Sequence, residues 1–236
     1  MSSISIIGLG TYARAIGTRA IEGGNAVEVI GCDAAKTKDL ADELGGGATA
    51  GTFGTAPAGD IVVLAVPYAS AVSVVAQYGD ALAGKVVIDI SNTFTAADDT
   101  ELVTPDGASG AQEIAKAVPA SAHVVKAFNT VFAHVLALGR PLDVLFAGDD
   151  AQAKVSVSAF IESLGLRPLE VGSLEMAHWL EGAALLMMGA GRPWRGVQHR
   201  PRRRRCEQRK RRAGTEHRQD RAGRPVVYQV GGTREC

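Results

Sequence analysis

The feature that most constrains this chain is a glycine-rich turn between an apolar run, residues 4–7 (ISII), and a helix-like segment, residues 12–22. The turn, GLGTYA at residues 8–13, fits the pattern G-x-G-x-x-A. In this pattern Gly8 permits a tight turn, Gly10 lets the backbone approach a pyrophosphate, and Ala13 lets the helix pack against the strand. The backbone amides of Thr11 and Tyr12 would then face an anion at the helix N-terminus. The turn therefore predicts a dinucleotide-binding site.

Short apolar runs alternate with helix-like segments along residues 1–189, and several runs are apolar on both faces, which is typical of buried parallel strands. The predicted strands are Ile4–Ile7, Ala26–Ile30, Ile61–Val66, Val86–Ile90, Val124–Ala127, Val144–Ala147 and Pro168–Val171. The predicted helices are Tyr12–Glu22, Ala35–Leu44, Ala69–Tyr78, Ala111–Ala117, Ala151–Leu164 and Leu174–Met188. This alternation predicts an α/β fold with a Rossmann-type doubly wound parallel sheet over residues 1–172, followed by a short C-terminal helical part over residues 173–189.

Cys32 and Asp33 end the second predicted strand, about 20 residues after the glycine turn. In a dinucleotide-binding domain, the residue at this position contacts the adenosine ribose. An acidic residue at this place accepts the ribose hydroxyls, so Asp33 favours NAD. Lys36 lies on the following turn, where it could reach the 2′-phosphate of NADP or simply be solvated at the start of a helix. The choice between NAD and NADP therefore stays open at this stage.

Charge divides the chain into two unlike parts. Residues 1–189 contain 10 Lys and Arg against 21 Asp and Glu, whereas residues 190–236 contain 15 against four. The basic tail has no regular hydrophobic period, so we expect it to be disordered. It begins abruptly within a helical pattern, which favours a frameshifted origin. Nucleic-acid binding is the weaker interpretation, because no aromatic stacking residues or binding module accompany the arginines.

Several classes of protein are disfavoured by the rest of the sequence. No run of about 18 apolar residues or secretory signal pattern is present, so we expect a cytoplasmic protein without membrane spans. The three scattered cysteines do not suggest a disulfide framework, and the histidines lack metal-ligand spacing, so we expect no metal site. We expect Trp179, Leu180 and their neighbours at near-helical spacing to form a core or dimer face.

A series of further motifs carries a family resemblance over about residues 3–189. They include DIVVLAVPYASAV (60–72), GKVVIDISNTF (84–94) and HVVKAFNTVFAHVL (123–136). In this order the chain resembles the NADPH-dependent coenzyme F-420 reductase family and its relatives, which include the dinucleotide-binding domain of STEAP-type ferric reductases. The resemblance implies a homodimeric Rossmann enzyme that transfers a hydride between NADP(H) and a deazaflavin or flavin. The cofactors would carry the chemistry, so no catalytic side chain is predicted.

Mapped onto this sequence, the resemblance adds residues to the predicted cofactor site. Ala65, Val66, Pro67 and Tyr68 would line the ribose and nicotinamide side of the groove, at the carboxyl end of the sheet. Asn92 and Asn129 each end an apolar strand, where an amide can meet a ligand or cap a helix. Asp89 is expected to be structural, and Lys126, set between apolar residues, is expected to be buried or in the groove.

Three functions remain in view at this stage. The first is hydride transfer between NADP(H), or NAD(H), and coenzyme F-420 or a flavin. The second is reduction of another small substrate, such as an imine or aldehyde, on the same domain. The third is binding of a dinucleotide without catalysis.

Overall fold

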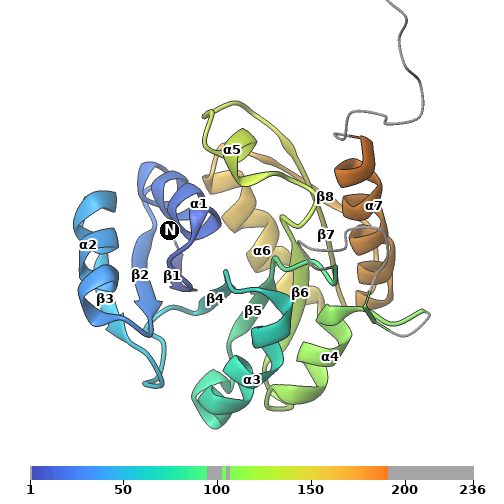
Figure 1. Ribbon diagram of the computed structural model, residues 1–236, viewed down its shortest axis with the longest axis horizontal. Helices are drawn as coiled ribbons and strands as arrows, with labels where there is room; N and C mark the ends of the chain where they lie inside the picture. Colours follow the sequence, from blue (N-terminus) through green and yellow to red (C-terminus); the bar gives the residue numbers. More distant parts are fainter. Residues whose placement is uncertain (1, 95–102, 105–106, 191–236) are drawn as a thin grey trace, which may run out of the picture. The chain divides into compact units, whose positions relative to one another are not determined.

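In the part of the chain that the structure describes, eight strands alternate with helices (Figure 1). The computed structural model describes residues 2–94, 103–104 and 107–190. The strands are β1 (Ser3–Ile7), β2 (Ala26–Gly31), β3 (Thr49–Thr52), β4 (Ile61–Leu64), β5 (Val86–Asp89), β6 (His123–Ala127), β7 (Asp143–Gly148) and β8 (Arg167–Glu170). The helices are α1 (Thr11–Glu22), α2 (Ala34–Leu44), α3 (Tyr68–Tyr78), α4 (Gly110–Ala117), α5 (Ala133–Leu136), α6 (Ala151–Ser163) and α7 (Ala177–Ala190), with short 3-10 helices η1 (Gly79–Leu82) and η2 (Leu174–Met176).

The strands form one sheet in the order β3-β2-β1-β4-β5-β6-β7-β8. Strands β1 to β6 pair in parallel, as predicted, and the chain reverses its direction of winding between β1 and β4. Strand β7 pairs antiparallel with β6 and parallel with β8, a departure from a fully parallel sheet that the apolar pattern of β7 did not reveal. The fold is therefore the predicted doubly wound α/β type, whose ligand crevice lies at the carboxyl ends of the strands beside the reversal.

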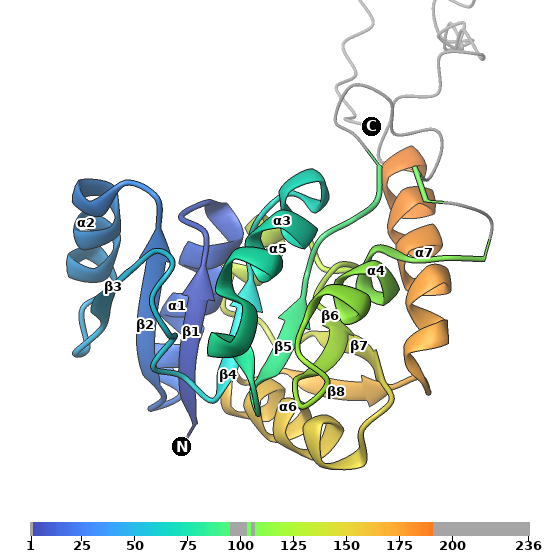
Figure 2. The ribbon, with the colours of Figure 1, turned by 90° about the horizontal axis from the view of Figure 1, so that it is seen from below.

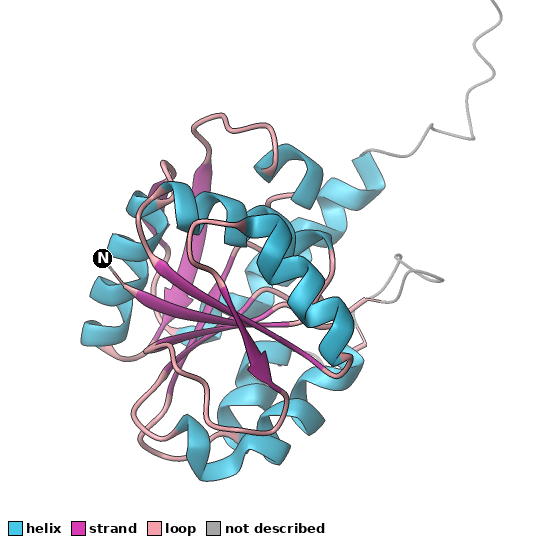
Figure 3. Cartoon of the chain, turned by 90° about the vertical axis from the view of Figure 1, so that its left-hand side faces the viewer, coloured by secondary structure: helices cyan, strands magenta, loops and turns pink. Residues whose placement is uncertain are grey.

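Helices cover both faces of the sheet, as the views from below and from the side show (Figures 2 and 3). Residues of α1, α2 and α6 pack on one face against Ile4, Ile6 and Val63. Residues of α3, α4 and the start of α7 pack on the other face against Ile7, Val62 and Leu64. The central strands are thus buried on both sides, which accounts for their continuous apolar sequence.

Most predicted elements are confirmed to within one or two residues, and the exceptions have physical causes. Strand β3 was not predicted, because its sequence TAGT is small and polar and it lies exposed at the sheet edge. The four-residue helix α5 was also missed. Of the two predicted roles for Trp179, core or dimer face, the core role is wrong, because its relative exposure is 67%, whereas Leu180 on the same helix is buried. The dimer face stays a prediction.

The predictions for the basic tail fall, apart from Ala190, outside the described residues. Among the helices of the described residues, none has the length and apolar character needed to cross a bilayer.

Candidate dinucleotide site

The glycine turn packs tightly against two neighbouring strands. Gly8 has φ +124°, and a Cβ atom there would lie 2.2 Å from the carbonyl oxygen of Ala65. The amide of Gly8 also donates to the carbonyl of Ile30 over 2.8 Å. Only glycine satisfies both the positive φ and the close backbone approach. Gly10, in contrast, stands at the N-cap of α1 with no atom within 4 Å of its hypothetical Cβ, and no side chain caps the helix.

A cleft of about 780 Å³ opens where this turn meets the carboxyl ends of β4 and β5. Its lining brings together the following predicted site residues: Gly10, Thr11, Tyr12, Ala65, Val66, Pro67, Tyr68 and Asn92. Ala13 is fully buried behind the turn, so its part is in packing. Pro67 also immediately precedes α3, so both of its predicted roles, cleft wall and helix start, fit the structure. The free amides of the first turn of α1 face this region without a competing cap.

A smaller cavity of about 220 Å³ continues from the turn toward the end of β2. Gly8, Cys32, Val66 and Pro67 are among its lining residues. Its place between β1, β2 and α3 is that of the adenosine half of a dinucleotide in this type of fold.

Asp33 and Lys36 are exposed and lie beside Cys32, at the start of α2. The Asp33 carboxylate accepts the backbone N–H of Lys36 over 3.1 Å and so caps α2. This hydrogen bond, more than the nearby Lys36 ammonium, holds the pKa of Asp33 below its ordinary value. The Lys36 Nζ atom lies 3.5 Å from the second carboxylate oxygen. Asp33 therefore carries a structural task that the sequence pattern alone did not show.

Two tyrosines border the cleft, and both phenols are engaged. The Tyr12 hydroxyl donates to the carbonyl of Val131 over 2.9 Å, and burial raises the pKa of Tyr12. The Tyr68 hydroxyl donates to the carboxylate of Glu113 on α4. Burial, reinforced by this hydrogen bond, raises the pKa of Tyr68. Both side chains are therefore neutral hydrogen-bond donors at physiological pH, held in place by their acceptors.

Asn92 and Asn129 form a reciprocal pair at the ends of β5 and β6. The Asn129 side-chain amide donates to Oδ1 of Asn92 over 3.0 Å, and the Asn92 amide donates to the carbonyl of Asn129 over 3.2 Å. A cavity of about 230 Å³ adjoins this pair and shares Tyr12, Asn92 and Phe94 with the main cleft. Asn129 was a predicted site residue among the remaining lining, which consists of Asn129, Thr130, Phe132, Ala184, Met187 and Met188.

Lys126 lies beneath this pair and is fully buried, as the sequence suggested. Its Nζ atom donates to Asp89, to the carbonyl of Ser91 and to Glu181, each over 2.7 Å. Glu181, on α7, also accepts from Thr93 Oγ1 at 2.8 Å and from the first amide of α4. Sequence reasoning missed Glu181, although a single acid within the otherwise apolar helix AHWLEGAALLMMGA was a usable signal. The network fastens α7 to the carboxyl edge of the sheet.

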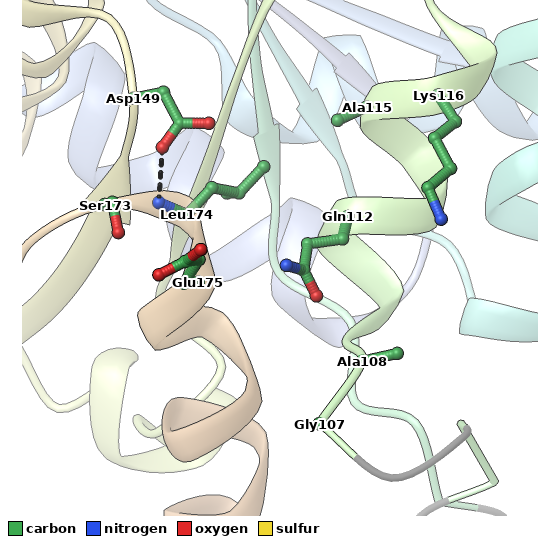
Figure 4. Close-up of a pocket in the computed structure, with 9 residues that line it drawn as sticks. All are labelled: Gly107, Ala108, Gln112, Ala115, Lys116, Asp149, Ser173, Leu174 and Glu175. Carbon is green, nitrogen blue, oxygen red and sulfur yellow. Dashed lines mark hydrogen bonds between the residues drawn. The ribbon is translucent and has the colours of Figure 1, made fainter.

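A separate cavity of about 790 Å³ runs along α4 and holds none of the predicted site residues (Figure 4). Gln112 and Lys116 line it from α4, and Asp149 and Glu175 line it from the opposite wall. The Asp149 carboxylate accepts the amide of Leu174 over 2.8 Å, so this acid holds η2 in place. Asp149 follows the antiparallel strand β7, at the sheet edge opposite the glycine turn, so this cavity is not part of the dinucleotide cleft.

Sheet order, glycine turn and cleft together define a Rossmann-type dinucleotide-binding domain. Comparisons with known proteins agree with this class. Residues 3–93 match the family described as NADP oxidoreductase coenzyme F420-dependent. The match covers less than half of the chain and shows that residues 3–93 resemble NADP-dependent oxidoreductases.

Similar proteins extend the match beyond residue 93. The chain is 31% identical over 189 residues to metalloreductase STEAP3 of Rattus norvegicus, covering 78% of this chain and 37% of the relative. It is 34% identical over 138 residues to the F420-dependent NADP reductase of Methanocaldococcus jannaschii, covering 56% of this chain and 61% of the relative. The chain is homologous to both, and it spans less than two thirds of the length of either.

A solved structure from Arthrobacter sp. FB24, provisionally assigned as an F420-dependent NADP reductase, has a TM-score of 0.69 and 26% sequence identity. The likeness covers 80% of this chain and 91% of that one. The similarity in fold therefore extends well beyond the 91 residues from 3 to 93 that match the family model.

Proposed function

We propose that the protein binds NADP(H) and transfers a hydride between its nicotinamide and a deazaflavin, such as coenzyme F420, or a flavin. The observation that carries the proposal is the junction of two cavities at the carboxyl edge of the sheet. The main cleft fits the dinucleotide, and the adjoining apolar cavity shares Tyr12, Asn92 and Phe94 with it. Two flat rings could lie face to face at this junction, and positioning of this kind supplies most of the catalysis in hydride transfer between cofactors.

The choice of NADP over NAD follows from the local geometry around Asp33. Its carboxylate is committed to capping α2 and faces Lys36, so it is poorly placed to bind both ribose hydroxyls. Lys36 is exposed, and its ammonium can turn from its surface pair with Asp33 toward a 2′-phosphate, to which it would supply a charge-assisted hydrogen bond. The match of residues 3–93 to the family described as NADP oxidoreductase supports the same cofactor.

Affinities of NADPH and NADH for the wild-type protein and for Lys36→Ala test this choice. Removing a hydrogen bond to a charged group costs about 1.5 kcal/mol, or roughly tenfold in Kd, and only for NADPH. Lys38→Ala is the matched control, because Lys38 lies on the same helix and pairs with Asp42. Cys32→Arg should shift the preference further toward NADPH. Equal effects of Lys36→Ala on both dinucleotides would contradict the proposal.

Activity is tested by following NADPH oxidation with coenzyme F420, with FMN and without an acceptor. Oxidation that depends on either acceptor is the expected result. Binding of NADPH without turnover on any acceptor would instead favour a non-catalytic dinucleotide-binding protein, and turnover only on a small imine or aldehyde would favour a different reductase.

A further inference from the structure

The side-chain amide of Asn129 is held in one orientation. Both of its N–H groups are used, one by the carbonyl of Leu180 at 2.9 Å and the other by Oδ1 of Asn92 at 3.0 Å. A backbone carbonyl only accepts, so Leu180 fixes which end of the amide carries the nitrogen. The oxygen must therefore occupy the other position. Asn129 is only 3% exposed, and its Oδ1 has no hydrogen-bond partner among the described residues.

The backbone just before Asn129 adopts a strained conformation. Phe128 has φ +63°, the only positive φ of a non-glycine residue in the described part of the chain. The Asn129 amide donates to the carbonyl of Ala127 over 2.9 Å, which closes a tight γ-turn around Phe128. The ring of Phe128 is fully buried, with its centre 6.3 Å from that of Phe160. Strain retained by packing in this way is concentrated at functional positions in proteins.

Asn129 stands in the wall of a cavity. It lines the cavity of about 230 Å³ whose walls include Phe94, Phe132, Met187 and Met188. The Lys126 network lies next to it and fixes the wall formed by α7. A buried acceptor without a donor is unfavourable, so a ligand that brings an N–H group gains affinity at this point.

We infer that Oδ1 of Asn129 is a fixed recognition point for an N–H donor on the edge of a planar ring. This inference rests on the proposed function and names the feature by which the site selects its ligand. Two rings of that function carry such a donor, the carboxamide-bearing nicotinamide and the flavin or deazaflavin ring with its N3–H. The apolar walls would contact the ring faces, while Oδ1 of Asn129 would accept a hydrogen bond from the N–H group on the ring edge.

Ligands that lack the donor provide the test without altering the protein. The 3-acetylpyridine analogue of NADP replaces the carboxamide NH₂ by a methyl group, and 3-methylriboflavin blocks the N3–H of riboflavin. Kd values are measured for each donor and donor-less pair. Loss of one hydrogen bond that leaves a buried acceptor unsatisfied predicts roughly tenfold weaker binding of one donor-less ligand. The pair that shows the loss identifies which ring Asn129 contacts.

The same Kd values are then measured on Asn129→Leu, with thermal unfolding as a check of the fold. We expect this variant to bind the donor and donor-less members of the affected pair with nearly equal affinity. A discrimination that persists unchanged in Asn129→Leu, or its absence for both pairs in the wild-type protein, would overturn the inference.

If Asn129→Leu fails to fold, a second pair of variants tests whether the ring binds in the cavity that Asn129 lines. Met187 lines the cavity and is 41% exposed, so Met187→Trp can fill the cavity from its rim. Leu186→Trp is the matched control, because Leu186 is 76% exposed and is not part of the lining. Met187→Trp should weaken binding of the discriminated ring at least tenfold and Leu186→Trp should not; equal effects would count against the inference.

These outcomes are separable from those of the proposed function, because they measure binding and not turnover. Weaker binding of a donor-less ligand without hydride transfer would refute the proposed function alone. Hydride transfer with equal binding of donor and donor-less ligands would refute the inference about Asn129 alone.

Discussion

Replacement of Lys126 by Met should be among the most destabilising single changes in the chain. The Lys126 side chain is fully buried, and its Nζ atom lies 2.7 Å from both Asp89 and Glu181, which are also fully buried. Met has a similar length without the charge, so the substitution leaves two carboxylates in the interior with no cation. Removing one partner of a buried ion pair costs about 3–5 kcal/mol, because the remaining charge is not compensated. For a domain of this size that corresponds to a fall in Tm of roughly 6–20 °C.

Urea denaturation at neutral pH, followed by circular dichroism, measures this change. Lys38→Met is the matched control, because Lys38 pairs with Asp42 on the exposed face of α2, and exposed pairs contribute little that is measurable. Glu181→Gln should cost less than Lys126→Met, since Lys126 keeps Asp89 and the Ser91 carbonyl as partners. A Lys126→Met variant as stable as Lys38→Met would refute the conclusion that the network holds α7 to the sheet.

Three further changes probe the turn and the helix starts. Gly8→Ala should weaken dinucleotide binding and lower the free energy of unfolding by more than about 1 kcal/mol, because the φ of +124° and the Ala65 carbonyl exclude a Cβ atom. Unchanged NADPH binding in calorimetry would refute this prediction. Ser109→Ala removes the capping box of α4 and should lower the free energy of unfolding by about 1 kcal/mol in urea denaturation. An unchanged free energy of unfolding would show that the cap does not stabilise the helix. Asp33→Asn retains a capping side chain but not the charge. Because the folded pKa of Asp33 is lowered from 3.8, its carboxylate stabilises the fold above that pH and the contribution is lost as the pH falls through the folded value. The difference between the urea midpoints of variant and wild type should therefore shrink as the pH falls below the ordinary value of 3.8, and a difference that widens on acidification would be inconsistent with this sign.

The elements of the fold were predictable wherever burial imposed a pattern. Strand β4 reads IVVL with every residue buried, and such a run has few alternatives to a central parallel strand. Strand β3 reads TAGT and is mostly exposed, so its identity comes from pairing with β2 and leaves almost no trace in its composition. The antiparallel direction of β7 is likewise set by the connection that precedes it, and its alternating core residues are compatible with either direction.

The candidate site was predictable where local backbone geometry dictates the residue type, as at Gly8. It was not predictable where a contact spans distant segments. Asn129 could be placed at a strand end, but its orientation depends on the carbonyl of Leu180, 51 residues later. Glu181 could not be assigned to Lys126 for the same reason, because 55 residues separate them. The sequence marks such residues as unusual in their surroundings, and only the fold supplies their partners.

The distribution of the site along the chain explains why the cofactor is better defined than its reaction partner. The glycine turn, the Cys32–Lys36 segment and the Ala65–Tyr68 wall all lie within residues 3–93, the part that matches the reductase family. The walls of the second cavity come mainly from later residues, including Asn129, Phe132 and Met187. Helix α7 supplies one of these walls, and a charged network at Glu181 fastens it to the sheet edge. Under the proposed function, in which the second cavity holds the acceptor, a homologue can keep the dinucleotide half unchanged and alter its acceptor through the loop after β6 and the face of α7. Exchange of these two segments with those of a relative should change acceptor affinity while leaving NADPH affinity nearly constant.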